Sequence, residues 1–115
     1  MMEELLFYLV CQKEYLSIVE FLIKDTHLEI NSKNLFGNTP FHSACYNGFI
    51  SIIKILIKDI RLNFNALNND GRTPFYLSCI YNQHNHLEIF KILIKDTRLE
   101  FNNQNKDGYT SFYFA

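Results

Sequence analysis

Residues 37–45 read Gly-Asn-Thr-Pro-Phe-His-Ser-Ala-Cys, and residues 71–75 begin the same stretch again as Gly-Arg-Thr-Pro-Phe. In both copies a threonine stands directly before a proline. The threonine hydroxyl can cap a helix, and proline is well suited to the first helical position because its missing N–H has no partner there anyway. Each copy therefore predicts the start of a short helix. The copies lie 34 positions apart, which indicates a structural repeat.

The period of 34 extends over most of the chain. The sequence Leu-Ile-Lys-Asp at 22–25 recurs at 56–59, and Ile-Lys-Asp recurs at 94–96 after the register slips by three residues within 81–86. Further pairs at the same shift are Phe7 with Phe41, Cys11 with Cys45, and Cys45 with Cys79. One unit is expected to contain a helix, a second helix, an extended finger and a turn.

The polar residues of each second helix fall on one narrow stripe. In the middle unit they are Ser51, Lys54 and Lys58, at spacings of three and four. Their counterparts are Ser17, Glu20 and Lys24, and Glu88, Lys91 and Lys95. Such helices are expected to be buried by neighbours on both sides. The Leu-Glu-Ile-Asn sequence at 28–31 alternates with period two, which predicts a finger packed on one side.

The stretches at 37–45 and 70–75 resemble the ankyrin repeat signature, and the resemblance covers nearly the whole chain. It implies an all-α solenoid of stacked helix pairs with short β-hairpin fingers. Tetratricopeptide repeats share the period, but they carry a tryptophan pattern and no Gly-x-Thr-Pro turn. The chain contains no tryptophan.

We expect a single ankyrin repeat domain over 1–115. It consists of a half-repeat at about 1–33, a repeat at 34–67, a repeat with the three-residue insertion at 68–104, and a truncated repeat at 105–115. Leucines replace Thr-Pro in the first unit, and the last unit stops inside its first helix. The chain is therefore interpreted either as a fragment of a larger ankyrin protein or as a protein that uses an apolar end as a contact.

Charge and hydropathy exclude several classes of function. The formal charge of −1 comes from 11 basic and 12 acidic residues without a basic stripe, so no nucleic-acid partner is expected. The start of the chain is acidic and its apolar run is short, unlike a signal peptide. No apolar run approaches a membrane span, so no membrane partner is expected either. An intracellular, cytoplasmic location is predicted.

The cysteines and histidines offer the only hints of chemistry. Cys11, Cys45 and Cys79 occupy equivalent positions, which are spaced along a stack and do not converge on one point, so buried free thiols are predicted. His84 and His86 lie in the insertion, which is interpreted as a solvated loop, with a metal site as the alternative. No motif for a nucleophile, a phosphate loop or a metalloprotease is present. No catalytic residue, cofactor, metal or small-molecule substrate is expected.

Two further sets of residues are interpreted as structural. The resemblance implies that His42 forms hydrogen bonds between hairpins, a role that Tyr76 takes over in the next unit with a weaker network. Asp25, Asp59 and Asp96 each close a second helix, where a negative charge opposes the helix dipole. A turn-forming role through side-chain hydrogen bonds is therefore predicted for them.

The resemblance also implies a binding surface on the concave face of the stack. The contact positions it assigns are Phe36, Asn38, Tyr46, Asn47, Asp70, Arg72, Ile80, Tyr81 and Tyr109, with Leu35, Asn69, Lys106 and Asp107 in the same row. Aromatic residues and arginine dominate binding hot spots, so Phe36, Tyr46, Arg72, Tyr81 and Tyr109 are the preferred contacts. Phe36 could instead pack on the first half-repeat, and Tyr81 could be absorbed by the insertion. The predicted function is a non-enzymatic module that binds a partner protein. The alternative is a structural spacer, or a fragment of a larger multidomain ankyrin protein whose activity lies elsewhere.

Overall fold

The computed structural model describes residues 2–81 and 86–100. These residues form six α-helices and no β-strand. The helices are α1 (Met2–Gln12), α2 (Leu16–Leu22), α3 (Pro40–Asn47), α4 (Ile50–Ile57), α5 (Pro74–Tyr81) and α6 (His86–Ile94). No helix in this part of the chain is long and apolar enough to cross a membrane.

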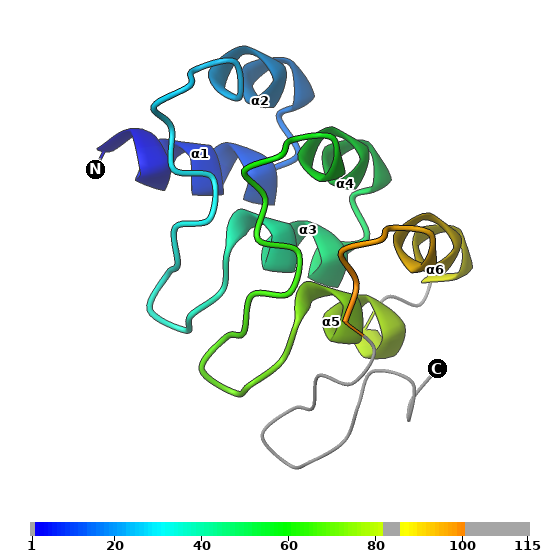
Figure 1. Cartoon of the computed structure of the whole chain (residues 1–115). Coiled ribbons are helices and arrows are strands. Elements are labelled where there is room, and N and C mark those ends of the chain that lie inside the picture. The colour runs from blue at the N-terminus through cyan, green and yellow to red at the C-terminus, as the bar shows by residue number, and fades with distance from the viewer. Residues whose placement is uncertain (1, 82–85, 101–115) are drawn as a thin grey trace.

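The helices stack in two layers, which Figure 1 shows as α1, α3 and α5 in one row and α2, α4 and α6 in the other. Within the first row, α1 packs on α3 and α3 on α5, while α2 contacts α4 in the second. Phe7, Phe41 and Phe75 are fully or almost fully buried at equivalent places in α1, α3 and α5. Each such side chain contributes about 1.5 to 3 kcal/mol relative to an exposed one. The predicted repeat is therefore a repeat of buried positions.

The Thr-Pro sequences begin α3 and α5 as predicted. Thr39 caps α3, because its Oγ1 accepts a hydrogen bond from the backbone N–H of His42 at 3.2 Å. Nδ1 of His42 accepts in return from the Thr39 N–H at 3.0 Å, which closes a capping box. Helix α3 ends at Gly48, whose φ of +73° is the left-handed conformation that glycine adopts at low cost.

The fingers between the helix pairs are one-sided, as their period-two pattern predicted. Leu28 and Ile30 are buried while Glu29 between them is exposed. The β-hairpins that the resemblance implied contain no strand within the described residues. In the finger before α3 the turn is closed by two backbone bonds, from the N–H of Asn34 to the carbonyl of Asn38 and from the N–H of Gly37 to the carbonyl of Asn34, both at 2.9 Å.

The aspartates that close the second helices form turns, as predicted. Oδ1 of Asp59 accepts from the backbone N–H of Arg61 at 2.9 Å, and Asp25 and Asp96 accept in the same way from the residue two positions on. The guanidinium of Arg61 also holds Asp59 through Nε at 2.9 Å and Nη2 at 2.7 Å. Through these bonds Arg61 lowers the pKa of Asp59, and the pair is mostly shielded from solvent.

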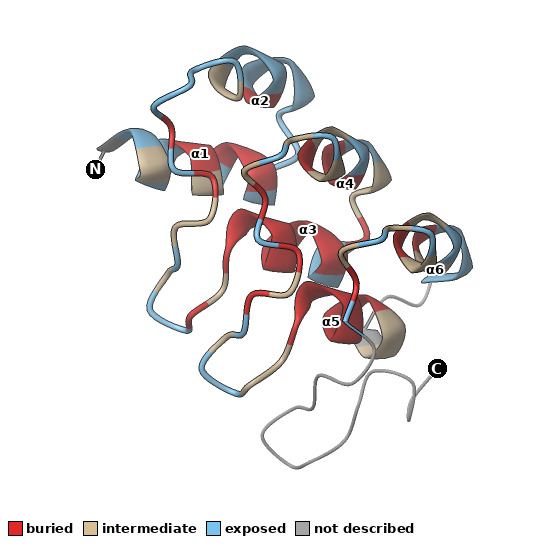
Figure 2. Cartoon of the chain, in the orientation of Figure 1, coloured by how far each residue is buried: buried red, intermediate tan, exposed pale blue. Residues whose placement is uncertain are grey.

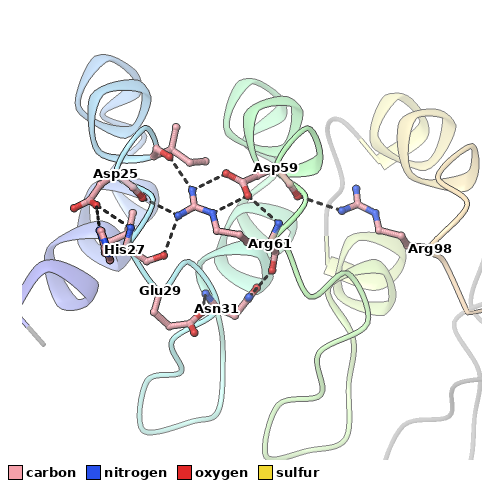
Figure 3. Close-up of polar contacts among 9 residues, drawn as sticks. Asp25, His27, Glu29, Asn31, Asp59, Arg61 and Arg98 are labelled. Atoms are coloured by element: carbon pink, nitrogen blue, oxygen red, sulfur yellow. Dashed lines mark hydrogen bonds and ion pairs between the residues drawn. The ribbon is translucent and has the colours of Figure 1, made fainter.

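Arg61 reaches back into the preceding repeat, a contact that sequence analysis did not predict. Its Nη2 donates to the carbonyl of Ile23 at 2.8 Å, and its Nη1 donates to the carbonyls of Asp25 at 2.7 Å and Leu28 at 3.0 Å (Figure 3). Ile23 caps the carboxyl-terminal end of α2, where backbone carbonyls lack partners within the helix. The arginine of one repeat thus completes the hydrogen bonding of the repeat before it.

The same clamp recurs one repeat further on. Arg98 pairs with Asp96 at 2.7 Å and donates to the carbonyl of Ile57 at 2.6 Å and to that of Asp59 at 3.4 Å. Its guanidinium also lies 5.3 Å from the centre of the Phe64 ring. We call these two residues, Arg61 and Arg98, the carbonyl clamps.

Asparagine amides join the fingers in a second set of bonds. Nδ2 of Asn31 donates to the carbonyl of Arg61 at 2.8 Å, and its Oδ1 accepts from the N–H of Asn63 at 2.7 Å. Asn65 makes the equivalent bonds to the carbonyl of Arg98 and the N–H of Glu100. In each case the side-chain amide of one finger bonds the backbone N–H and carbonyl groups of the next finger. Neighbouring fingers are therefore joined by hydrogen bonds although they form no β-sheet.

The outer helix of the first unit departs from the predicted burial. The prediction holds for α4, in which Ile52 and Ile53 are fully buried and the polar stripe is exposed. It is wrong for α2, in which only Val19 is buried, while Ile18 is 43% and Phe21 76% exposed. Figure 2 shows the difference between the outer surface of α2 and the buried face of α4. The reason is that α2 contacts α4 on one side only.

Replacing the first carbonyl clamp should destabilise the fold strongly. Arg61→Ala leaves three carbonyls of the preceding repeat without these donors and Asp59 without its cation, so we expect the free energy of unfolding to fall by about 2 to 4 kcal/mol. Arg61→Lys should recover little of this, because an ammonium cannot reproduce the guanidinium fork.

Urea unfolding followed by circular dichroism measures both effects. Lys54→Ala is the control, since Lys54 is an exposed cation of α4 and its loss should change the free energy by less than about 0.5 kcal/mol. Equal stability of Arg61→Ala and Lys54→Ala would show that the clamp contributes nothing.

Candidate functional site

A surface hollow of about 460 Å³ lies between α1, α3, α5 and the two described fingers. It is lined by Tyr8, Gln12, Asn34, Phe36, Asn38, His42, Ser43, Tyr46, Asn47, Asn68, Asp70 and Leu77. Asp70 is the charged group among these lining residues, because His42 is neutral at pH 7, as its pKa below shows. The lining is otherwise made of amides, hydroxyls and aromatic rings, which is a chemistry of hydrogen bonding and stacking.

Two equivalent asparagines build the finger side of the hollow. Oδ1 of Asn34 accepts from the N–H groups of Phe36 at 2.9 Å and Asn38 at 3.0 Å, and its Nδ2 donates to the hydroxyl of Tyr8 at 2.9 Å. Asn68 repeats this: its Oδ1 accepts from the N–H groups of Asp70 and Arg72, both at 3.0 Å. These amides are occupied by the protein itself and fix the shape of the turns.

The two fingers are also bonded to each other beside the hollow. Nδ2 of Asn68 donates to Oδ1 of Asn38 at 2.9 Å, and the N–H of Asn69 donates to the carbonyl of Phe36 at 3.0 Å. The approach is close at Gly37, where an added Cβ would lie 2.5 Å from Oδ1 of Asn69. Gly37 also has a φ of +78°, so any other residue would both strain the turn and push the fingers apart.

His42 links the floor of the hollow to the next repeat, as the resemblance implied. Its Nδ1 accepts from the Thr39 N–H, so the ring proton lies on Nε2, which donates to the carbonyl of Arg72 at 2.9 Å. The side chain is fully buried. Burial lowers the pKa of His42 to about 4; the hydrogen bond to the Arg72 carbonyl opposes this effect, and nearby Lys33 contributes to it. His42 is therefore a neutral structural group, not a general base.

Five of the predicted contact residues line this one hollow: Phe36, Asn38, Tyr46, Asn47 and Asp70. The two aromatic side chains are open to solvent, with 72% of Phe36 and 51% of Tyr46 exposed. The alternative that Phe36 packs internally on the first unit is therefore wrong.

Among the other predicted contacts that the structure describes, Leu35, Asn69, Arg72 and Ile80 do not line the hollow. Arg72 is half-buried and lies with its guanidinium 5.3 Å from the centre of the Tyr76 ring, and Ile80 is half-buried in α5. Tyr81 is the last residue of α5, but its side chain lies outside the described residues. Tyr109, Lys106 and Asp107 also lie outside them. Leu35 is almost fully exposed at the tip of its finger.

Sequence analysis missed the lining residues that come from the first unit and from the turns. Tyr8 and Gln12 belong to α1, and only the packing of α1 beside α3 brings them to the hollow. Asn34 and Asn68 carried a usable signal, because they stand 34 positions apart and asparagine is typical of tight turns.

The three cysteines are free thiols without the properties of a nucleophile. Cys11 and Cys45 are buried, as predicted, while Cys79 is half-buried. Burial raises the pKa of Cys11 to about 12 and that of Cys79 to about 11, and it raises the pKa of Cys45 as well. At neutral pH the nucleophilic thiolate form is therefore negligible.

The candidate metal ligands are only partly described. His84 lies outside the described residues, and His86 is not in the loop that was predicted but opens α6 with an exposed side chain. Among the described residues, no three His, Cys, Asp or Glu side chains come together in a way that could hold a metal ion.

Comparison with known protein families matches residues 6–107 to the family described as ankyrin repeats (3 copies). The match covers α2 to α6, most of α1 and all the residues that line the hollow. No curated protein matches the chain.

The burial of His42 should make the fold sensitive to mild acid. The folded pKa of about 4 lies below the ordinary value of 6.5, so between these two values the unfolded chain binds a proton that the folded chain does not. The His42 contribution is therefore complete above pH 6.5 and is lost as the pH falls towards 4, by about 3 kcal/mol in all. The stabilising contributions of Asp59 and Asp96 are also lost in acid, but the lowered pKa values of these carboxylates place that loss at still lower pH.

The measurement is the free energy of unfolding at a series of pH values, for the natural chain and for His42→Gln. Glutamine has no titration in this range, so the variant should be less stable at pH 7 but nearly independent of pH between 6.5 and 4.5. Parallel curves for the two proteins would mean that another group causes the acid sensitivity.

Proposed function

The chain belongs to the ankyrin repeat family, whose repeats generally mediate protein–protein interaction, and we propose that it is a non-enzymatic module that binds an extended segment of a partner protein in the hollow. On this proposal the successive repeats at 34–67 and 68–104 form a solenoid, and the hollow is part of its concave face.

The observation that carries this proposal is the contrast between the rim and the floor of the hollow. The floor groups Asn34, His42 and Asn68 are engaged in hydrogen bonds that hold the repeats together. At the rim, the rings of Phe36 and Tyr46 remain largely exposed. Large aromatic side chains held on a rigid base are typical of binding hot spots, since they contribute contact area without first having to be ordered.

Two amide groups at the hollow have capacity left for a peptide backbone. Asn38 uses its Oδ1 and Asn47 its Nδ2, to Asn68 and to Ser43 at 3.3 Å. Within the described residues, Nδ2 of Asn38 and Oδ1 of Asn47 make no hydrogen bond. One is a donor and the other an acceptor, so together they can pair with the carbonyl and the N–H of an extended chain. The carboxylate of Asp70 favours a segment that carries a lysine or arginine.

An enzyme would need a nucleophile or an acid–base group at the hollow. His42 is buried, neutral and bonded at both ring nitrogens, and the thiols are protonated. Binding is therefore the function that these side chains support best. A structural spacer is the competing proposal, and it requires no ligand at the hollow.

A display library of random short peptides distinguishes a peptide-binding module from a structural spacer. The purified chain should enrich a family of peptides with a shared aromatic or basic position. The double variant Phe36→Ala/Tyr46→Ala should lose that enrichment, because both rim rings are gone. Ile60→Ala is the matched control: Ile60 is 97% exposed and does not line the hollow, so the variant should enrich the same peptides.

Unchanged melting temperatures for the three proteins establish that any loss reflects the surface rather than the fold. Selected peptides that bind the double variant as well as the natural chain would contradict the proposed site. Failure to enrich any peptide family would favour the spacer.

A further inference from the structure

The carboxylate of Asp70 differs from the other aspartates of the repeats in having no cation beside it. Asp59 and Asp96 each hold an arginine at 2.7 Å. Asp70 is exposed at the tip of its finger and lines the hollow. Within residues 2–81 and 86–100 its carboxylate forms no ion pair and no hydrogen bond, and only its backbone N–H is engaged, with Asn68. The hollow therefore contains a negative charge that is available to a ligand.

Three aromatic side chains line the hollow together with Asp70: Tyr8, Phe36 and Tyr46. Phe36 has the same position in its repeat as Asp70 has 34 residues later, so the two residues lie at the tips of successive fingers. These fingers run side by side (Figure 1), and the N–H of Asn69 donates to the carbonyl of Phe36 at 3.0 Å. The face of an aromatic ring attracts a cation, as a carboxylate does. Both kinds of group thus favour the same ligand chemistry.

The chain itself holds an arginine between groups of these two kinds. The guanidinium of Arg98 lies 5.3 Å from the centre of the Phe64 ring, and its Nη2 lies 2.7 Å from Oδ2 of Asp96. This arrangement suits arginine because a guanidinium is flat, so it can stack on a ring while its N–H groups donate to a carboxylate. The ammonium group of lysine is a compact point charge and lacks this flat, forked shape.

We propose that the hollow binds an arginine side chain of the partner segment, with its guanidinium paired to Asp70 and stacked on the rings of Phe36 and Tyr46. The inference rests on the proposed function, since it identifies one side chain of the segment that binds there. Among the residues that line the hollow, Asp70 carries the only charge at neutral pH. An acidic or phosphorylated side chain would find no cation among them, so the charge of the hollow selects against such segments.

The arginine would supply the sequence preference that the amides of the hollow cannot. Nδ2 of Asn38 and Oδ1 of Asn47 can pair with the backbone of a bound segment, and backbone groups are the same in every sequence. Asp70 and the rings instead meet a side chain. Recognition of the segment is thereby divided between amides that bind its backbone and a carboxylate with two rings that select one residue.

A matched series of peptides tests the choice of arginine. The natural chain selects peptides from the random display library, and each selected sequence is then made with arginine, lysine or citrulline at the shared position. Citrulline keeps the flat shape of arginine but has no charge. We expect fluorescence anisotropy to show that either replacement weakens binding by roughly three- to tenfold, because lysine loses the stacked fork and citrulline loses the attraction to the carboxylate.

The variant Asp70→Asn identifies the group that pairs with the guanidinium. It keeps the backbone N–H that bonds to Asn68, so the turn should remain intact. We expect it to bind the arginine and citrulline peptides about equally, because neither gains from charge pairing. Glu20→Gln is the matched control: Glu20 is an exposed acid of α2 that does not line the hollow, so its loss should leave the preference for arginine unchanged.

Three results would overturn the arginine site while leaving a peptide-binding module in place. They are selected peptides without a shared arginine, a lysine peptide that binds as tightly as the arginine peptide, and an Asp70→Asn variant that keeps the full preference for arginine over citrulline. Failure to select any peptide family would contradict peptide binding at the hollow, and with it the arginine site.

Discussion

Backbone carbonyls at the ends of the outer helices accept hydrogen bonds from an arginine of the following repeat, and much of the structure depends on these bonds between repeats. Arg61 donates to the carbonyls of Ile23, Asp25 and Leu28 while Asp59 holds the same guanidinium from the other side. The two residues of the Asp-x-Arg sequence therefore act together: the aspartate forms the turn, and the arginine bonds the carbonyls of the preceding repeat. Because each clamp faces the repeat before it, the stability of one repeat includes a contribution from the next, as in other linear repeat proteins.

The hollow depends on the same kind of bonding. His42 donates to the carbonyl of Arg72 in the next repeat, and Asn68 donates to Asn38 across the fingers. These bonds set the distance between successive fingers, so they also fix the spacing of the exposed rings above them. Neighbours in the sequence differ in their surroundings: His42 and Asn34 hold the shape through hydrogen bonds, while the rings of Tyr46 and Phe36 are exposed.

Local patterns predicted the repeat well, because each rests on the conformation of a few adjacent residues. Thr39-Pro40 specified a helix start, and the alternation at 28–31 specified which side of the finger is buried. The clamp was not predictable in this way. That Arg61 follows Asp59 by two positions is visible in the sequence, but its carbonyl partners lie more than thirty positions away and depend on how far one repeat is rotated on the next. Two other features depend on the packing between repeats in the same way. Tyr8 reaches the hollow because α1 packs beside α3, and the exposure of α2 depends on which helices pack against it.

Native-state hydrogen exchange at the backbone amides of Asn63 and Asn69 tests the repeat-to-repeat bonding most directly. Both residues are exposed, but their N–H groups donate to Oδ1 of Asn31 at 2.7 Å and to the carbonyl of Phe36 at 3.0 Å, each in the preceding finger. Bonding between repeats predicts that these two amides exchange about as slowly as that of Ile53 within α4. Exchange at the rate of an unprotected loop would show that the fingers are not joined in solution and that the repeats are held by apolar packing alone.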